Sequence, residues 1–458
     1  MKKKHVIRMI GLAMAITVAL AGCGGNKETG AGDNQKVESS GTEDTAQEES
    51  SGEEVKIPVI VTTGTNDGMD LQMQEAFDGF NEAYKGKYQL DVEYMAGSAD
   101  DYRSKLKMLN TSDSMPALID IGTEPAFFDL LVENGRLADI APYLENDEEW
   151  RSWLMPQGIE ELTREDGTMY MVPPTGLQMV GIYYNKELFE QAGIEKFPET
   201  WDEFWTACEK LTAEGITPLS LMTAETAWCP MLGMTAYLGG SQNGRDFMSV
   251  RYPDNFDTSE FKEAVEILKK EFEYTTADAV GGTYALAANH FFSGDTAMIA
   301  NGPWMMPSLS DPDYAPAGFE QKVGYAPFPG NLMIGSIAGW SVTSCHDQAV
   351  VDGAVEFMKF YSSPKYATQR ALKSGQLSSV IEFPQEEYDK LIPAMKDCVD
   401  ISKEVEIVLP SYQSQWDPVN QNDVFGREIP NLVTGSITTE DFIEMLNKGA
   451  AQYKKDIE

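Results

Sequence analysis

Beyond residue 56, short apolar runs alternate with amphipathic stretches along the chain. The runs have the length and β-branched content of buried strands, and the stretches carry apolar residues at helical spacing. Strands are expected over residues 57–61, 88–94 and 117–121, and helices over the stretch opened by Asn66-Asp67-Gly68 and over residues 101–110. This order predicts a doubly wound α/β unit with a parallel sheet, in which ligands bind beyond the carboxyl ends of the strands.

A later region of the chain carries clear helix signals. Thr200 and Glu203 have the spacing of a capping box, in which each side chain accepts a hydrogen bond from a free backbone donor. Gly215 follows the apolar stripe of that helix and predicts its end. Residues 261–272 and 349–361 have the pattern of two further amphipathic helices. The sequence therefore predicts mixed α/β structure over most of the folded part.

The first residues have the pattern of an export signal. Residues 1–22 open with lysines, continue with an apolar run too short to span ~30 Å of hydrocarbon, and end in Leu20-Ala21-Gly22 before Cys23. This ending is similar to the lipobox of bacterial lipoproteins, and we expect the Cys23 thiol to carry the lipid that anchors the protein in the bilayer. The alternative is an ordinary secretory signal with an incidental cysteine.

Residues 23–55 are expected to form a tether. They are rich in Gly, Ser, Thr and acidic residues and nearly free of aliphatic ones, so they cannot bury enough apolar surface to fold. The predicted location is the outer side of the cell membrane. A long acidic tether suits a Gram-positive surface, and a Gram-negative periplasm is the alternative.

The charge balance excludes several classes of partner. Lys and Arg number 35 and Asp and Glu number 73, so the formal net charge is −38. A chain this acidic lacks the basic stripe that binds nucleic acid, and it cannot dock on anionic lipid through charge. Five cysteines in 458 residues also exclude a disulfide-scaffolded fold.

An ordered set of motifs resembles one protein family. The segments that carry the resemblance are residues 130–144, 172–173, 183–194 (YYNKELFEQAGI), 198–204 (PETWDEF), 292–304 (FSGDTAMIANGPW), 354–375, 377–379 and 434–441. Together they are similar to family 1 of the extracellular solute-binding proteins, which feed carbohydrate ABC importers. The resemblance covers most of the chain beyond residue 56.

This resemblance implies a two-lobed fold of the type II periplasmic-binding-protein class, with two doubly wound α/β lobes joined by a hinge. By motif position, one lobe is expected over residues 56–174 plus 338–394 and the other over 175–337 plus 395–458. The ligand is expected between the lobes, which close on it. The implied partners are a carbohydrate and the transmembrane subunits of an ABC permease, and the protein is expected to be a monomer.

A sugar-binding cleft requires aromatic surface for the C–H faces of the sugar and amides or carboxylates for its hydroxyls. Trp304 follows Asn301-Gly302-Pro303, a turn where an indole has no helical stripe to join, and the family stacks an aromatic ring on its sugar at this position. The other residues expected to contact ligand are Trp228, Trp340, Trp416, Glu124, Asn66, Asp67 and Glu225. The alternatives are core packing for the tryptophans and helix capping for Asn66 or Asp67.

No motif indicates an enzyme or a cofactor. The sequence contains no G-x-S-x-G, G-x-G-x-x-G, P-loop, H-E-x-x-H or C-x-x-C pattern, and we expect neither cofactor nor metal. His290 and His346 are isolated, and a bridge between Cys208 and Cys229 is an open alternative to buried thiols. Two other functions compete with transport. The chain could sense ligand for a membrane signalling receptor, or it could be a surface glycosidase.

Overall fold

A computed structural model describes residues 54–63, 67–96, 99–120, 125–154, 156–164, 166–172, 177–337, 339–374 and 385–457. The predicted signal peptide, Cys23 and nearly all of the predicted tether lie outside these residues. Within the described ranges, no helix has both the length and the apolar character needed to cross a membrane.

The first sheet has four strands in the order β2-β1-β3-β9. These strands are β1 (Val55–Thr63), β2 (Tyr88–Ala96), β3 (Leu118–Asp120) and β9 (Trp340–Val342). β1 is parallel to β2 and to β3, whereas β9 is antiparallel to β3. The first three strands and their parallel pairing confirm the prediction, and the edge strand β9 returns from a distant part of the sequence.

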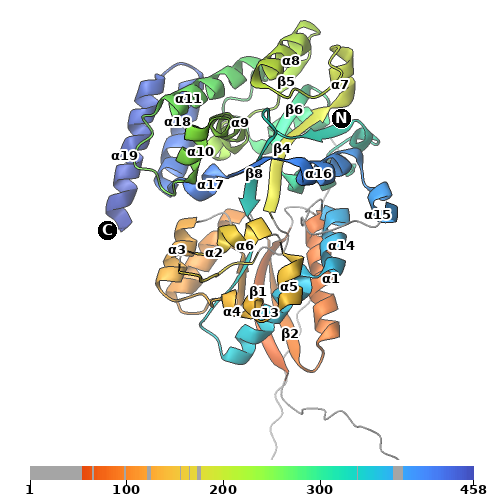
Figure 1. Ribbon diagram of the computed structural model, residues 1–458, viewed down its shortest axis with the longest axis vertical. Coiled ribbons are helices and arrows are strands. Elements are labelled where there is room, and N and C mark those ends of the chain that lie inside the picture. Colours follow the sequence, from red (N-terminus) through yellow and green to blue (C-terminus); the bar gives the residue numbers. More distant parts are fainter. Residues whose placement is uncertain are drawn as a thin grey trace, which may run out of the picture. The chain divides into compact units, whose positions relative to one another are not determined.

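Helices cover both faces of this sheet (Figure 1). Ile57 and Val59 of β1 pack in one core with α1 and α13, whereas Ile60 packs in a second core with α2 and α3. This alternation follows from the two-residue period of a strand. The helices of this first lobe are α1 (Asp67–Ala83), α2 (Ala99–Thr111), α3 (Pro125–Glu133), α4 (Ala141–Glu145), α5 (Glu148–Trp153), α6 (Pro156–Leu162), α13 (Gln348–Ser362) and α14 (Pro364–Ser374).

The second sheet has the order β10-β8-β4-β6-β5, and β7 also pairs with β4. Its strands are β4 (Leu177–Asn185), β5 (Thr217–Leu219), β6 (Thr296–Asn301), β7 (Val323–Ala326), β8 (Leu332–Ile337) and β10 (Ile407–Pro410). β4 runs antiparallel to β6, β7 and β8, while β10 is parallel to β8 and β5 to β6. This sheet is therefore mixed. The chain comes from the first lobe into β4 and returns to it after β8, so these two strands run in opposite directions.

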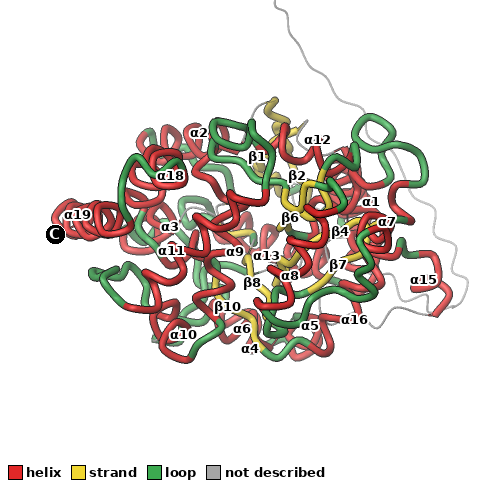
Figure 2. Tube along the Cα trace, turned by 90° about the horizontal axis from the view of Figure 1, so that it is seen from above, coloured by secondary structure: helices red, strands yellow, loops and turns green. Residues whose placement is uncertain are grey.

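Helices enclose the strands of the second lobe as well (Figure 2). They are α7 (Lys186–Gln191), α8 (Trp201–Ala213), α9 (Trp228–Gly239), α10 (Gln242–Ser249), α11 (Ser259–Glu271), α12 (Tyr284–Phe292), α15 (Gln385–Lys390), α16 (Pro393–Glu404), α17 (Tyr412–Gln415), α18 (Gly426–Val433) and α19 (Thr439–Ile457). Short helical turns are η1 (Glu225–Ala227), η2 (Phe272–Tyr274), η3 (Pro303–Leu309), η4 (Phe319–Gln321) and the π-helix η5 (Asn420–Phe425). Tyr388 of α15 and Met395 of α16 pack with the same core as Tyr183 of β4, so α15 and α16 accompany the second sheet.

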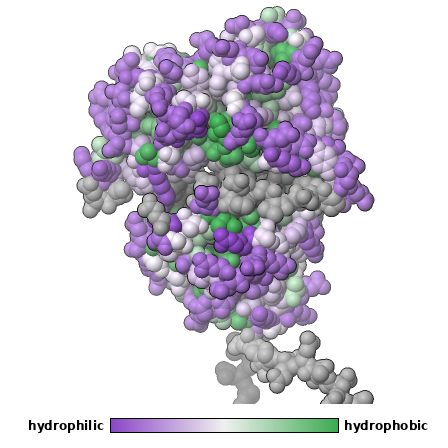
Figure 3. Space-filling model, viewed as in Figure 1, coloured by the Kyte–Doolittle hydropathy of each residue, from purple (hydrophilic) through white to green (hydrophobic). Residues whose placement is uncertain are grey.

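The helix signals read from the sequence are confirmed. The Thr200 hydroxyl accepts a hydrogen bond from the Glu203 backbone N–H (3.3 Å), and the Glu203 carboxylate accepts one from the Thr200 N–H (3.2 Å). Gly215 has a left-handed φ of 76° just beyond α8, as a helix-terminating glycine requires. Cys208 and Cys229 are both buried free thiols, so they do not form a bridge. Polar side chains cover most of the face shown in Figure 3, in keeping with the acidic composition.

Glu271, the last residue of α11, lies inside the core of the second lobe with 5% of its surface exposed. It lines a cavity of about 20 Å³ together with Trp201 and Cys229, which is room for about one water molecule. Within the described chain, neither Glu271 Oε2 nor Trp201 Nε1 has a hydrogen-bond partner. Burial raises the pKa of the Glu271 carboxyl well above its usual value, and the position at a helix C-terminus also disfavours the charge.

Replacing Glu271 by Gln should remove a pH-dependent loss of stability. The unfolded carboxyl has a pKa of about 4.3, and the folded one has a higher pKa, so the native state binds more protons between these two values. Wild-type stability should therefore fall with rising pH across this window, by up to ~1.4 kcal/mol per pH unit, relative to Glu271→Gln. Urea unfolding at several pH values measures the difference. Glu263→Gln, an exposed change on the same helix, is the control, and parallel curves for all three proteins would contradict the expectation.

Candidate functional site

Three aromatic side chains meet at the starts of three helical segments in the second lobe. Trp228 is the first residue of α9, Tyr284 is the first of α12, and Trp304 is the second of η3. The ring centroid of Trp228 lies 5.0 Å from that of Tyr284 and 6.3 Å from that of Trp304. All three side chains are only partly buried. The cluster therefore offers flat aromatic surface of the kind that stacks on the C–H faces of a sugar.

The backbone beneath Trp304 is firmly held. The Tyr183 hydroxyl donates a hydrogen bond to the Gly302 carbonyl (2.8 Å), and the Asn301 side chain accepts one from the Gly302 N–H (2.8 Å). The Asn301 amide also donates to the Tyr284 hydroxyl (3.0 Å). A Cβ at Gly302 would lie 2.1 Å from the Trp304 ring, so the indole can pack over residue 302 only because this residue is glycine. The turn that orients Trp304 is thus pre-organised.

Trp228 is placed by a strained turn. Glu225, Thr226 and Ala227 have φ angles of 54°, 61° and 55°, three successive left-handed residues without a glycine among them. Such conformations are unfavourable and concentrate at functional sites. The Glu225 carboxylate is exposed and accepts a hydrogen bond from the Tyr284 backbone N–H (3.3 Å). The turn therefore carries both an indole and a carboxylate next to the aromatic cluster.

The structure brings together three of the predicted ligand contacts, Trp304, Trp228 and Glu225. Trp304 packs partly against the core of the second lobe, so its ring is less exposed than an open cleft would leave it. Its segment η3 lies against α14 of the first lobe. The cluster therefore lies on the part of the second lobe that faces the first.

Two predicted contacts, Trp340 and Trp416, lie in hydrophobic cores instead. Trp340 is 3% exposed and packs edge-on against Phe77, while Trp416 is 0% exposed and packs against Phe256 and Phe261. Neither ring presents a face to a ligand in this structure, and we do not include them in the site. The physical reason is that both segments meet aromatic residues from distant parts of the chain, which their own sequence neighbourhood does not reveal.

The remaining predicted contacts cannot be placed, and two residues were missed. Asn66 and Glu124 lie outside the described residues, and Asp67 is described only as the first residue of α1. Tyr284 and Asn301 join the cluster although no prediction assigned them a role. The Thr283 hydroxyl caps α12 through the Leu286 N–H, and this cap is the one local signal that marks Tyr284 as a helix start. In the described ranges, no group of three His, Cys, Asp or Glu residues is arranged to hold a metal ion.

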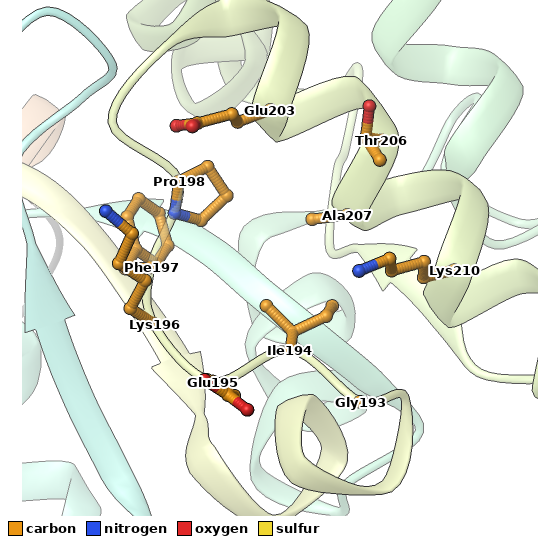
Figure 4. A pocket seen from close by; sticks show the side chains of 10 residues that line it. All are labelled: Gly193, Ile194, Glu195, Lys196, Phe197, Pro198, Glu203, Thr206, Ala207 and Lys210. Atoms are coloured by element: carbon orange, nitrogen blue, oxygen red, sulfur yellow. The ribbon is translucent and has the colours of Figure 1, made fainter.

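A concave region between α7 and α8 has a volume of about 320 Å³ (Figure 4). Ile194 and Phe197 contribute apolar surface to it, and two of its charged side chains have partners. Lys196 pairs with Glu199 (2.7 Å), and Glu203 belongs to the capping box of α8. This pocket shares no residue with the aromatic cluster, and its paired charges indicate no particular ligand.

Two α/β lobes, with an aromatic cluster on the part of one lobe that faces the other, define a two-lobed solute-binding protein. The chain belongs to the bacterial extracellular solute-binding protein family, whose model matches residues 66–368. It is 26% identical over 337 residues to the sn-glycerol-3-phosphate-binding periplasmic protein UgpB of Brucella abortus, covering 69% of this chain and 72% of that protein. It is 30% identical over 175 residues to the multiple sugar-binding protein of Streptococcus mutans, covering 35% and 39%. The fold is similar to that of a chitin oligosaccharide binding protein, with a TM-score of 0.72, 20% identity, and coverage of 88% and 99%.

A histidine fastens the loop that leads into the cluster. His290, in the last turn of α12, lies 3.1 Å from Asp278 and 3.3 Å from Asp295. Asp278 belongs to the loop that ends at Tyr284, so this contact ties the loop to the helix. Burial alone disfavours the imidazolium, but the hydrogen bonds to the two carboxylates outweigh it and raise the pKa of His290.

Replacing His290 by Gln should therefore destabilise the protein in a pH-dependent way. A raised pKa stabilises the fold below the unfolded value of about 6.5, and this contribution is lost as the pH rises through the folded pKa. We expect a loss of roughly 0.5–1 kcal/mol near pH 5.5 and almost none near pH 9. Chemical unfolding at both pH values measures it. Asp278→Asn should cause most of the same loss in wild type and little in the His290→Gln background, and additive losses would contradict the pairing.

Proposed function

We propose that this protein binds a carbohydrate, an oligosaccharide in particular, between its two lobes and delivers it to an ABC permease. The observation that carries the proposal is the partly exposed cluster of Trp228, Tyr284 and Trp304. Aromatic faces flanked by the Glu225 carboxylate suit a ligand that alternates C–H faces with hydroxyl groups. Membership of an extracellular solute-binding family supports the same function.

The proposal extends to the location of the protein. We infer that Cys23 is acylated and that the tether lets the lobes work outside the cell membrane, on the extracellular or periplasmic side. The support comes from the sequence alone, in which the cysteine directly follows an apolar run that ends in small residues. Two acyl chains suffice for stable anchoring where one would be marginal.

A phosphorylated ligand is the second candidate, because the Brucella abortus relative is named for glycerol 3-phosphate. The geometry of the cluster favours a neutral ligand. Glu225 contacts the cluster, and its carboxylate would repel a phosphate. The starts of α9 and α12 attract anions themselves, so the preference for a neutral ligand rests on the charge of Glu225.

Titration calorimetry against monosaccharides, oligosaccharides and glycerol 3-phosphate tests the proposal directly. The expected result is micromolar or tighter binding of a neutral oligosaccharide, with the sugar recovered intact. Binding of glycerol 3-phosphate alone would replace the proposed ligand class. Release of shorter sugars during incubation would show a glycosidase, and absence of binding across the panel would contradict the proposal.

Trp304→Ala should weaken binding of the sugar far more than it weakens the fold. Stacking contributes ~0.5–1.5 kcal/mol beyond burial, and burial contributes ~1.5–3 kcal/mol, so affinity should fall by about two orders of magnitude. Because the ring is only partly buried, the free energy of unfolding should fall by about 1–2 kcal/mol, less than the ~3–5 kcal/mol of a fully buried aromatic. Calorimetry and urea unfolding measure the two quantities on the same variant.

Trp153→Ala provides the matched control. Trp153 is also a partly buried tryptophan, but it packs against the core of the first lobe at the end of α5, away from the cluster. This variant should lose stability to a similar degree and bind the sugar normally. Equal affinity losses for both variants, or a Trp304→Ala protein that binds normally, would remove Trp304 from the proposed site.

Cys23→Ser should release the protein from the membrane without changing ligand binding. The hydroxyl cannot take the lipid, and the remaining export signal still directs secretion. Fractionation of expressing cells should move the protein from the membrane to the soluble extracellular or periplasmic fraction. Labelling of the cells with a radioactive fatty acid should mark the wild-type protein only, and a labelled Cys23→Ser protein would show that the cysteine is incidental.

A further inference from the structure

One carboxylate holds side chains of both lobes. Asp129 lies in the middle of α3 in the first lobe, and its side chain is 18% exposed. Its Oδ2 accepts hydrogen bonds from Arg251 Nη2 (2.6 Å) and from the Tyr252 hydroxyl (2.9 Å), both in the segment after α10 of the second lobe. Its Oδ1 lies 3.6 Å from Arg164 Nη1 of the first lobe. The same side chain thus has a partner in its own lobe and two in the other.

The second-lobe partners are rigidly presented. Tyr252 has a left-handed φ of 54°, an unfavourable conformation for an aromatic residue. Its N–H donates to the Gln415 carbonyl (2.6 Å), and its ring packs edge-on against Tyr453 with centroids 5.0 Å apart. The guanidinium of Arg251 lies 5.1 Å from the centre of the Tyr252 ring. These contacts fix the hydroxyl that reaches Asp129 across the boundary between the lobes.

Asp129 and its two second-lobe partners lie in segments near the strand ends where the chain crosses between the lobes. α3 follows β3, whose last residue pairs with Trp340, the first residue of β9 after the crossing from β8. Gln415 follows β10, which is parallel to β8 and therefore ends at the same edge of the second sheet. The contact is thus made between the edges of the two sheets that face each other, where approach of the lobes encloses a ligand.

We propose that Asp129, Arg251 and Tyr252 form a latch that stabilises the closed arrangement of the lobes. The effect of this latch on ligand binding rests on the proposed function. The effect of the latch on lobe closure does not. When the lobes separate, Asp129 loses its two hydrogen bonds but keeps Arg164, so the carboxylate is never left without a cation. The latch can therefore open at modest cost, as a reversible closure requires.

Asp129→Asn and Tyr252→Phe test the latch by removing the charge and the hydroxyl. Small-angle scattering of the ligand-free proteins should show a larger radius of gyration for both variants than for wild type. All proteins carry the same tether, so the difference reports on the lobes. Calorimetry should show sugar affinity lower by roughly 5- to 20-fold, since a smaller closed population weakens apparent binding.

Arg164→Gln and Asp147→Asn complete the design. Removing Arg164 leaves Asp129 without a partner in the open arrangement only, so this variant should be at least as compact as wild type and bind sugar at least as tightly. Asp147 pairs with Lys359 inside the first lobe, at similar burial, and its replacement should change neither radius nor affinity. Chemical unfolding verifies that all variants are folded.

The two readouts separate the latch from the proposed function. If no carbohydrate binds to any protein, the proposed function fails, but the scattering arm still decides the latch. If sugar binds and the radii of wild type, Asp129→Asn and Tyr252→Phe are equal, the latch is wrong while the function stands. Tighter sugar binding by Asp129→Asn or Tyr252→Phe would also overturn the latch, because the contact would then hold the lobes apart.

Discussion

The central strand β1 of the first sheet packs against helices on both of its faces, and this constraint limits where function can lie. In β1, Ile57 and Val59 pack in one core while Ile60 packs in another, so these three side chains are held in the interior of the lobe. The backbone of β1 also pairs with β2 on one side and with β3 on the other. Polar and aromatic groups that meet solvent therefore gather at strand ends and helix starts. Trp228, Tyr284 and Trp304 all occupy such positions.

The parts of the fold that depend on local signals could be predicted from the sequence. The capping box of Thr200 and Glu203 satisfies donors within a single helical turn, and Gly215 ends the same helix through its own backbone conformation. The alternation of β1 follows from its own side chains. Each of these features needs only neighbouring residues to form, and each is present in the structure.

The predicted ligand contacts that lie buried in this structure do so through contacts between distant segments. Trp340 starts a strand after a glycine, as a cleft residue would, but it is buried because α1 and α13 supply Phe77 and Phe357 around it. Trp416 follows a short loop and is buried because Phe256 and Phe261 come from another part of the lobe. The opposite holds for Tyr284, which joins the cluster through a hydrogen bond from Asn301 of β6 and a ring contact with Trp228 of α9. Sequence spacing contains none of these pairings.

A binding protein of this architecture must combine rigid placement of its aromatic rings with movement of its lobes. Contacts inside a lobe provide the first property, and contacts at the boundary between the lobes allow the second. Aromatic stacking rewards rings held in a fixed place, because ordering them on binding would cost part of the gain. The buried Tyr183 and Asn301 hydrogen bonds supply this fixity within the second lobe, where they are shielded from water. Lobe closure instead requires contacts that exchange readily with water. The bonds to Asp129 are of this kind, since they join partly exposed charged groups and the carboxylate retains Arg164 when they break. Different residues therefore provide the rigidity within a lobe and the movement between lobes, so one property does not limit the other.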